Sequence, residues 1–183
     1  MMDENIQLHL GCGKRYIPGF IHIDQAQFSH IDHCGSVGSL PMFYDNTVDL
    51  IYASHVLEYF DRTEVREVLK EWRRVLKVGG VLRVAVPDFA ALIKAYHLYG
   101  LDRILGPLYG RMESGVKIIY HKTVYDFDAL AAVLAANGFD KVQRYDWRET
   151  IHRDHDDYSQ SYLPHLDKDN GLLISLNVEA IKI

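Results

Sequence analysis

The sequence has only two cysteines, Cys12 and Cys34, in 183 residues. So few thiols cannot build a disulfide framework and are typical of a reducing compartment, which predicts a cytoplasmic protein. No apolar run approaches the roughly 18 to 20 residues that a membrane-spanning helix requires, so we expect no membrane association. Met1 to Asn5 are acidic and lack the apolar stretch of a signal peptide.

Positive charge is also scarce. The 20 Lys and Arg residues are outnumbered by 25 Asp and Glu, which gives a formal net charge of −5 at pH 7. Proteins that bind nucleic acid usually carry a basic face, so we expect no nucleic-acid partner. The sequence has no repeat and no linker, and its length predicts a single domain over residues 1–183. The sequence is also compatible with a homodimer.

Short apolar runs alternate with helical patterns, which predicts an α/β fold with a mostly parallel sheet. The predicted strands cover residues 7–10, 20–24, 31–33, 48–53, 81–86, 141–147 and 172–183. The predicted helices cover residues 62–77, 88–99 and 126–136. Two further segments, Leu101–Lys122 and the polar Thr150–Gly171, show no regular pattern. Because no helix is predicted between the last two strands, they can pair antiparallel.

The first of these helices has recognisable ends. Asp61 can cap its start, with Glu64 three residues later as in a capping box. Gly79 and Gly80 are expected to end it.

A Gly-x-Gly turn, Gly11-Cys12-Gly13, follows the first predicted strand. Such a turn lets backbone amides approach a ligand without obstruction by side chains. Dinucleotide sites add a third glycine and place an acid about 20 residues further on. Here Tyr16 occupies the third glycine position and Asp24 follows Gly13 by only 11 positions. Both facts favour S-adenosylmethionine, which has no phosphate, over a dinucleotide.

The Gly-x-Gly turn is the first of a series of motifs along the chain. They lie at Leu8–Gly13, Ile21–Asp24, Leu40-Pro41, Asp45–Ile51, Ala53–Glu58, Trp72–Gly80 and Val86–Asp88. Together they resemble the class I, Rossmann-like S-adenosylmethionine-dependent methyltransferases, in particular a small bacterial predicted-methyltransferase type. The resemblance covers nearly the whole chain. It implies a three-layer sandwich whose seven-stranded, mostly parallel sheet ends in an antiparallel hairpin, and it implies S-adenosylmethionine as the cofactor.

The resemblance also implies roles for individual residues. The expected cofactor contacts are Gly11, Cys12 and Gly13 for the methionine and ribose, Asp24 for the ribose hydroxyls, Ser36 and Val37 for the adenine, and Ala53, Ser54 and His55 beside the sulfonium. Many members have an aspartate where this chain has Ser36. Asp32 and Ser39 are alternatives for the adenine amino group.

This chain differs from the pattern of the resembling family in the connection after the Gly-x-Gly turn. Only about ten residues lead to the second strand, and Pro18 and Gly19 interrupt them, whereas a full crossover takes a dozen or more. We therefore expect the first crossover helix to be reduced to a turn. The cofactor site should then be more open, or closed by another segment.

Two residues are candidates for catalysis. His121 matches a histidine that recurs in the resembling family, and a histidine pKa near neutrality suits a general base. The alternative is a loop histidine bonded to backbone. Asp88 follows Pro87 at the start of a helix, where capping alone explains an aspartate, although the ends of parallel strands also face the ligand crevice.

The polar segment Thr150–Gly171 carries His152, His155 and His165 among aspartates. A metal site, a solvated loop and a lid are all compatible with this composition, but nothing in an irregular segment fixes a coordination geometry, so we expect no metal.

The predicted function is therefore methyl transfer from S-adenosylmethionine to a small-molecule or carbohydrate-like acceptor. The two irregular segments are expected to select that acceptor. The alternative is a non-catalytic S-adenosylmethionine-binding protein of the same fold, which the shortened crossover and Ser36 motivate.

Overall fold

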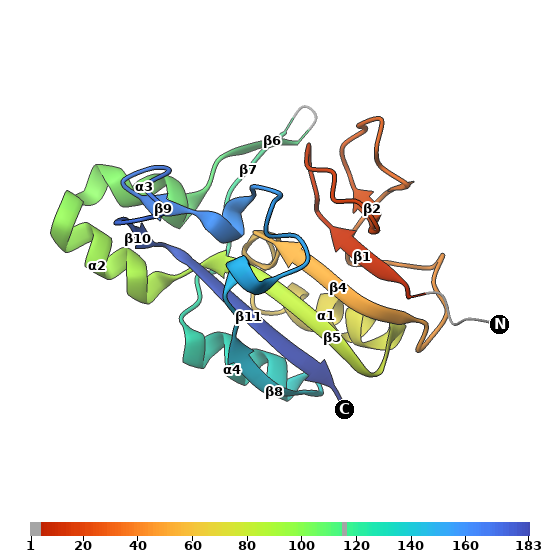
Figure 1. Ribbon diagram of the computed structural model, residues 1–183. Coiled ribbons are helices and arrows are strands. Elements are labelled where there is room, and N and C mark those ends of the chain that lie inside the picture. The colour runs from red at the N-terminus through yellow and green to blue at the C-terminus, as the bar shows by residue number, and fades with distance from the viewer. Residues whose placement is uncertain (1–4, 115–116) are drawn as a thin grey trace.

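The computed structural model describes residues 5–114 and 117–183. Seven strands form one sheet across it (Figure 1). In spatial order they are β3 (His33–Cys34), β2 (Ile21–Asp24), β1 (Gln7–Leu10), β4 (Val48–Ser54), β5 (Leu76–Pro87), β11 (Ser175–Lys182) and β8 (Phe139–Arg144). Only β11 is antiparallel to its neighbours, β5 and β8. The predicted α/β class, the parallel sheet and the antiparallel last strand are confirmed.

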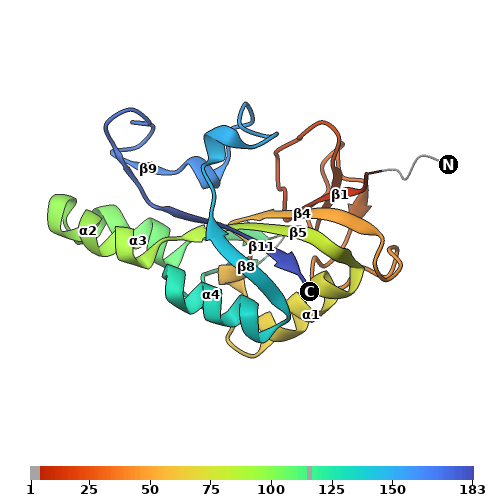
Figure 2. The same ribbon diagram turned by 60° about the horizontal axis from the view of Figure 1, so that its bottom comes forward.

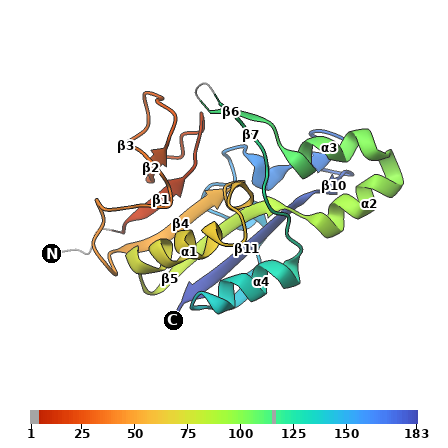
Figure 3. The ribbon, with the colours of Figure 1, turned by 180° about the vertical axis from the view of Figure 1, so that it is seen from behind.

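Two helices pack on one face of this sheet, as Figures 2 and 3 show: α1 (Glu64–Val75) and α4 (Phe127–Ala136). The main hydrophobic core lies between them and the strands, and its fully buried members include Leu8, Ile51, Leu69, Trp72, Val84, Leu130 and Leu176. Trp72 also donates a hydrogen bond from Nε1 to the carbonyl oxygen of Val37, 2.8 Å away. The core therefore fixes the loop after β3 as well as the helices.

The start of α1 agrees with the sequence prediction, but its end does not. Asp61 Oδ1 accepts hydrogen bonds from the N–H groups of Thr63 and Glu64, and the Glu64 carboxylate accepts one from the N–H of Asp61, which confirms the cap. At the other end the helix stops at Val75 and leads directly into β5.

Gly79 and Gly80 do not end the helix, contrary to the prediction. They lie within the bounds of β5, where the pairing with β4 shifts register. A Cβ on Gly80 would come within 2.9 Å of the carbonyl oxygen of Lys77, and Gly79 has a φ of +82°. The two glycines therefore permit a tight bulge in the strand.

The other face of the sheet carries polar and aromatic side chains instead of an apolar surface. The connections 11–20, 25–32 and 35–47, which join β1, β2, β3 and β4, contain only turns and bends, so no helix covers these strands on that side. One row of paired residues crosses six strands, and we call it the polar row: His22, His9, Tyr52, Arg83, Glu179 and Gln143. The predicted reduction of the first crossover helix is confirmed.

Residues 145–171, which we call the covering segment, lie over this face (Figure 2). The segment contains the 3-10 turns η2 (Trp147–Glu149) and η3 (Tyr158–Gln160) and the hairpin β9 (Tyr162–Leu163) with β10 (Leu172–Leu173). The ring of His152 stacks on that of Tyr52 with centroids 4.0 Å apart, and the Tyr52 hydroxyl donates a hydrogen bond to the Asp157 carboxylate. The third layer is therefore largely non-helical.

Beyond the carboxyl ends of the strands lie η1 (Leu57–Tyr59), α2 (Phe89–Tyr99), α3 (Leu101–Tyr109), β6 (Met112–Ser114) and β7 (Lys117–Ile119). Helix α3 occupies a stretch that was expected to be irregular because of Gly106 and Pro107. A proline removes only one N–H from a helix, and the N–H of Gly110 still bonds to the carbonyl of Gly106 at 2.7 Å. In the two described ranges, no helix is both long and apolar enough to cross a membrane.

The buried His152 makes stability depend on pH. The side chain is 0% exposed, and burial lowers its pKa to about 4. The unfolded chain, with an ordinary histidine pKa near 6.5, binds this proton first, so the stability it contributes is complete above about pH 6.5 and is lost as the pH falls toward 4. Between pH 7 and 4.5 we expect wild-type protein to lose about 2 kcal/mol more of its unfolding free energy than His152→Phe does.

Urea denaturation at the two pH values measures this difference. His97→Phe, which changes an exposed histidine, should behave as wild type. An unchanged pH dependence in His152→Phe would contradict the assignment.

Candidate functional site

A cavity of about 920 Å³ opens at the carboxyl ends of β1, β2 and β4. Its inner part is lined by His9, Gly11, Cys12, Gly13, Asp24, Gln25, Ala26, Phe28, Val37, Ser54, His55 and Val56. Its outer part is lined by residues from two separate stretches, which run from Arg103 to His121 and from Asp156 to Leu166. The two irregular segments of the sequence therefore meet across one space.

The Gly-x-Gly turn forms the floor of the inner part. Gly11 and Gly13 have φ angles of +64° and +55°, in the left-handed region that favours glycine. A Cβ on Gly11 would collide with Val56, whereas a Cβ on Gly13 would meet nothing within 4 Å. Gly11 is thus required by packing, and Gly13 exposes backbone to open space.

Asp24 ties this turn to the end of β2. Its Oδ2 accepts a hydrogen bond from the N–H of Gly13 and its Oδ1 accepts one from the N–H of Ala26, each at 2.8 Å. A carboxylate has about four acceptor sites, so each oxygen can accept one more hydrogen bond from the cavity. The carboxylate is therefore held rigidly and retains capacity for a ligand's hydroxyl groups.

Cys12 lies between the two glycines and is 2% exposed. Burial, assisted by the charge of Asp24, raises the pKa of its thiol to about 12. The sulfur therefore stays protonated and acts as packing rather than as a nucleophile.

The turn after β4 brings Ser54 and His55 to the cavity, while Ala53 is buried in the hydrophobic core. The Ser54 hydroxyl is buried and has no hydrogen-bond partner among the described residues. His55 has a φ of +55°, unusual for a residue other than glycine. Its N–H bonds to the carbonyl of Ala85 at 2.8 Å.

Of the residues expected to hold an adenine, only Val37 lines the larger cavity. Val37 lines the cavity, but Ser36 is exposed, does not line it, and accepts a hydrogen bond from the N–H of Gly38. Asp32 is bonded to the N–H of His22, also away from the cavity lining. The cavity lining also includes an aromatic residue, Phe28, which no motif had indicated.

Only one of the two candidate catalytic residues lines the cavity. His121 lines the outer part of the cavity, with its ring edge-on to that of Tyr59 at 4.9 Å. Asp88 does not line the cavity: its Oδ1 caps α2 through the N–H groups of Ala90 and Ala91, and its Oδ2 pairs with Arg144 at 3.3 Å. Capping and this ion pair account for Asp88.

The covering segment contacts the shortened first connection at the rim of the cavity. Arg15, in the shortened first connection, donates a hydrogen bond to the carbonyl of Asp156 at 2.9 Å and places its guanidinium 4.7 Å above the ring of Tyr158. Of the two alternatives expected for the shortened connection, a more open site or one closed by another segment, these contacts favour the second. The only sequence signal for it was the polar composition of residues 150–171, which also fitted a solvated loop.

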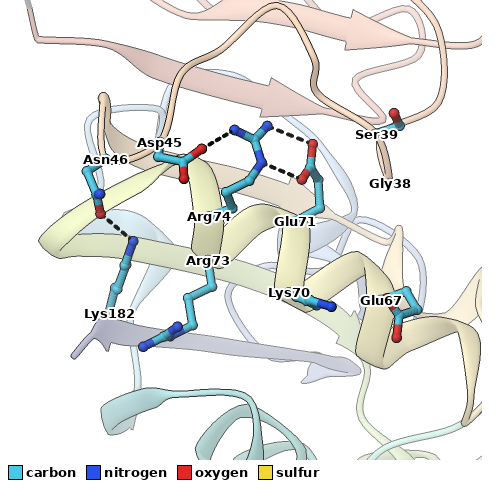
Figure 4. A pocket seen from close by; sticks show the side chains of 10 residues that line it. All are labelled: Gly38, Ser39, Asp45, Asn46, Glu67, Lys70, Glu71, Arg73, Arg74 and Lys182. Atoms are coloured by element: carbon cyan, nitrogen blue, oxygen red, sulfur yellow. Dashed lines mark hydrogen bonds and ion pairs between the residues drawn. The ribbon is translucent and has the colours of Figure 1, made fainter.

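A second cavity, of about 550 Å³, lies beside α1 (Figure 4). Two of its basic groups are already bonded, Arg74 to Glu71 and Asp45, and Lys182 to Asn46. Of the residues considered above as ligand contacts, it contains only Ser39. The larger cavity, with buried polar atoms that lack partners, is therefore the candidate site.

The structure brings no metal site into either cavity. In the part of the chain that it describes, no three His, Cys, Asp or Glu side chains lie together so that they could hold a metal ion. Of the three histidines of the polar segment, His165 lines the larger cavity and His152 is buried under the covering segment.

Residues 12–84 match the family model described as a methyltransferase domain. No curated protein matches the chain. Among solved structures, an S-adenosylmethionine-dependent methyltransferase from Methanosarcina mazei has a TM-score of 0.60 at 16% identity, covering 100% of this chain and 94% of that one. These values show a shared fold.

Two further structures agree with it. A methyltransferase from Thermotoga maritima, described as a possible histamine N-methyltransferase, has a TM-score of 0.60 at 16% identity, covering 98% of this chain and 83% of its own. The 1,6-didemethyltoxoflavin-N1-methyltransferase of Burkholderia thailandensis, solved with 1,6-didemethyltoxoflavin and S-adenosylhomocysteine, has a TM-score of 0.57 at 12% identity, covering 97% and 70%.

Arg15→Ala should loosen the covering segment. The variant loses one hydrogen bond and one cation–π contact, together worth about 1 kcal/mol at an exposed site. Amide hydrogen exchange of residues 153–163 should then be roughly fivefold faster, while exchange in β4 and β5 is unchanged. Arg66→Ala, on the exposed side of α1, is the matched control. Equal exchange rates in the two variants would show that Arg15 does not hold the segment.

Proposed function

We propose that this chain, which has the fold of the class I S-adenosylmethionine-dependent methyltransferases, binds S-adenosylmethionine and transfers its methyl group to a small-molecule or carbohydrate-like acceptor. The observation that carries the proposal is that one cavity joins the Gly-x-Gly turn, the Asp24 carboxylate and the turn after β4 to residues of the two segments with no regular sequence pattern. The match of residues 12–84 to a methyltransferase domain supports it.

The inner part of the cavity suits the cofactor. Asp24 has acceptor capacity for two ribose hydroxyls, and Val37 and Phe28 offer apolar contact for an adenine. The buried Ser54 hydroxyl, unpaired within the described chain, is available to a polar group of the methionine end. When bound, S-adenosylmethionine supplies a methyl group on a positively charged sulfur.

The outer part of the cavity would hold the acceptor. Residues between 103 and 113, Ile119, His121 and residues between 156 and 166 line it. They would orient the acceptor's nucleophilic atom in line with the sulfur–methyl bond. Most of the rate would come from this proximity and orientation. His121, the one candidate catalytic residue that lines the cavity, would accept the proton of the nucleophile.

The role of Asp24 can be tested by calorimetric titration with S-adenosylhomocysteine. Loss of two charge-assisted hydrogen bonds in Asp24→Ala should weaken binding by about 1.5–3 kcal/mol, roughly 10- to 100-fold. Because Asp24 also holds Gly13 and Ala26, the titration is repeated with the 2′,3′-dideoxy analogue. Removing the ribose hydroxyls should weaken binding to wild type but scarcely matter to Asp24→Ala.

Asp32→Ala is the matched control, since Asp32 also accepts a backbone hydrogen bond next to β2 but does not line the cavity. It should retain the full difference between the two ligands. An equal penalty for the analogue in wild type and in Asp24→Ala would refute the ribose contact. Tight S-adenosylhomocysteine binding without methyl transfer to any of a broad acceptor panel would favour the non-catalytic alternative.

A further inference from the structure

A buried carboxylate lies behind two histidines that line the cavity. Glu58, in η1, is 0% exposed, and neither of its carboxylate oxygens has a hydrogen-bond partner among the described residues. Leaving such a group unsatisfied is costly, and native structures rarely do so without a functional reason. Two histidine rings that line the cavity face it: His55 Nδ1 lies 3.2 Å and His121 Nε2 lies 3.9 Å from Glu58 Oε1.

The hydrogen bonds behind His55 fix where its protons lie. The Asn177 side-chain N–H donates to the carbonyl of Ser159, which leaves the Asn177 side-chain oxygen to accept from the hydroxyl of Ser175. Ser175 Oγ must then accept from His55 Nε2, 3.2 Å away. With Nε2 protonated, the neutral His55 ring presents its Nδ1 lone pair to Glu58. This tautomer of His55 therefore gives the Glu58 carboxylate no hydrogen bond.

The contacts of His121 fix its tautomer in the opposite sense. Its Nδ1 lies 3.2 Å from the carbonyl oxygen of Leu108, which can only accept, so Nδ1 carries the proton. The neutral ring therefore presents an unprotonated Nε2 toward Glu58, and the residue lines the cavity. At 3.9 Å the two atoms are too far apart for a hydrogen bond but close enough for an ion pair once His121 is protonated.

The position of the His121 ring is fixed on several sides. A Cβ on Gly110 would collide with its Nε2, and the Tyr59 ring stands perpendicular to it. The backbone of Glu58 contributes as well, because its carbonyl oxygen accepts the N–H of Lys122 at 2.7 Å. Glu58 thus sets both the backbone next to His121 and the charge beside its ring.

We infer that Glu58 is the positioning residue of a proton-accepting group, His55–Glu58–His121, and that the methyl acceptor reacts through an oxygen or nitrogen that must lose a proton. This inference rests on the proposed function and narrows its substrate class. A carbon or sulfide nucleophile that carries no exchangeable proton would have no use for the arrangement.

The proton balance of the step is complete within these residues. The acceptor's O–H or N–H bond breaks as the oxygen or nitrogen takes the methyl group, and the electron pair of the sulfur–methyl bond stays on sulfur. The released proton passes to Nε2 of His121, and the imidazolium that forms is stabilised by the Glu58 carboxylate.

Few other charged or titratable groups face this cluster. Burial and the charge of Glu58 raise the pKa of Tyr59 and of Tyr125 to about 12, so both phenols stay neutral near pH 7. Tyr158, from the covering segment, lies against His55 with ring centroids 5.3 Å apart. Burial lowers the pKa of His121, with Glu58 as the largest opposing influence, so the residue is unprotonated and able to act as a base at neutral pH.

Two measurements on Glu58→Gln test the inference. The first follows the histidine ring resonances with pH by NMR in the protein without ligand, using His121→Asn and His55→Asn to assign them. Without the carboxylate the imidazolium loses its stabilising charge, so the titration midpoint of His121 should fall by about one pH unit or more. The matched control is Glu67→Gln, which removes one exposed carboxylate from α1 and should leave the midpoint unchanged.

The second measurement separates a proton-accepting role from a structural one. Glu58→Gln replaces an unpaired buried charge with a neutral group of the same shape, so its thermal midpoint should equal or exceed that of wild type. A lower midpoint together with an unmoved His121 titration would overturn the inference and assign Glu58 to structure. If Glu58→Gln does not fold, Gly110→Ala provides the test. The added methyl group should displace the His121 ring from Glu58 and lower the same titration midpoint. An unchanged midpoint would overturn the inference.

A separate experiment tests the proposed function, whatever the role of Glu58. Titration with S-adenosylhomocysteine should give equal affinity in wild type and Glu58→Gln, because Glu58 does not line the cavity. Absent binding in both proteins would refute the cofactor site, while the NMR midpoints would still decide the role of Glu58.

Discussion

The short connection between β1 and β2 determines how one face of the sheet is covered. Residues 11–20 must return the chain to the start of a parallel neighbour, and they are too few to include a helix. Since the next two connections also lack helices, one face of the sheet has no helical layer over these strands. That face is built from the polar row His22, His9, Tyr52, Arg83, Glu179 and Gln143, and residues 145–171 cover part of it.

Covering the sheet and closing the site are therefore performed by the same residues. The covering segment is held to the sheet where His152 stacks on Tyr52, and it reaches the shortened connection where Arg15 contacts Asp156 and Tyr158. Its residues 156–166 then line the cavity opposite the Gly-x-Gly turn. We propose that cofactor binding and acceptor choice both depend on it, so that losing its packing on the sheet would affect the site as well.

Features with a local signal could be predicted from the sequence. The strands, the Asp61 cap and the Gly-x-Gly turn followed by an acid are patterns of neighbouring residues. The role of Gly79 and Gly80 was missed because it depends on the register between β4 and β5. The covering segment and the Glu58–His121 contact join residues far apart in the chain, and a glutamate within a motif gives no indication that a distant histidine lies 3.9 Å away.

A crystal structure of the protein grown with S-adenosylhomocysteine would show where the cofactor binds and whether the covering segment closes over it. We predict density in the larger cavity, with both ribose hydroxyls on Asp24, the sulfur on the side of Ser54 and His55, and residues 156–163 closed over the ligand. Density in the smaller cavity beside α1, or a ligand in the larger cavity with no contact to Asp24 and the covering segment displaced, would contradict the account.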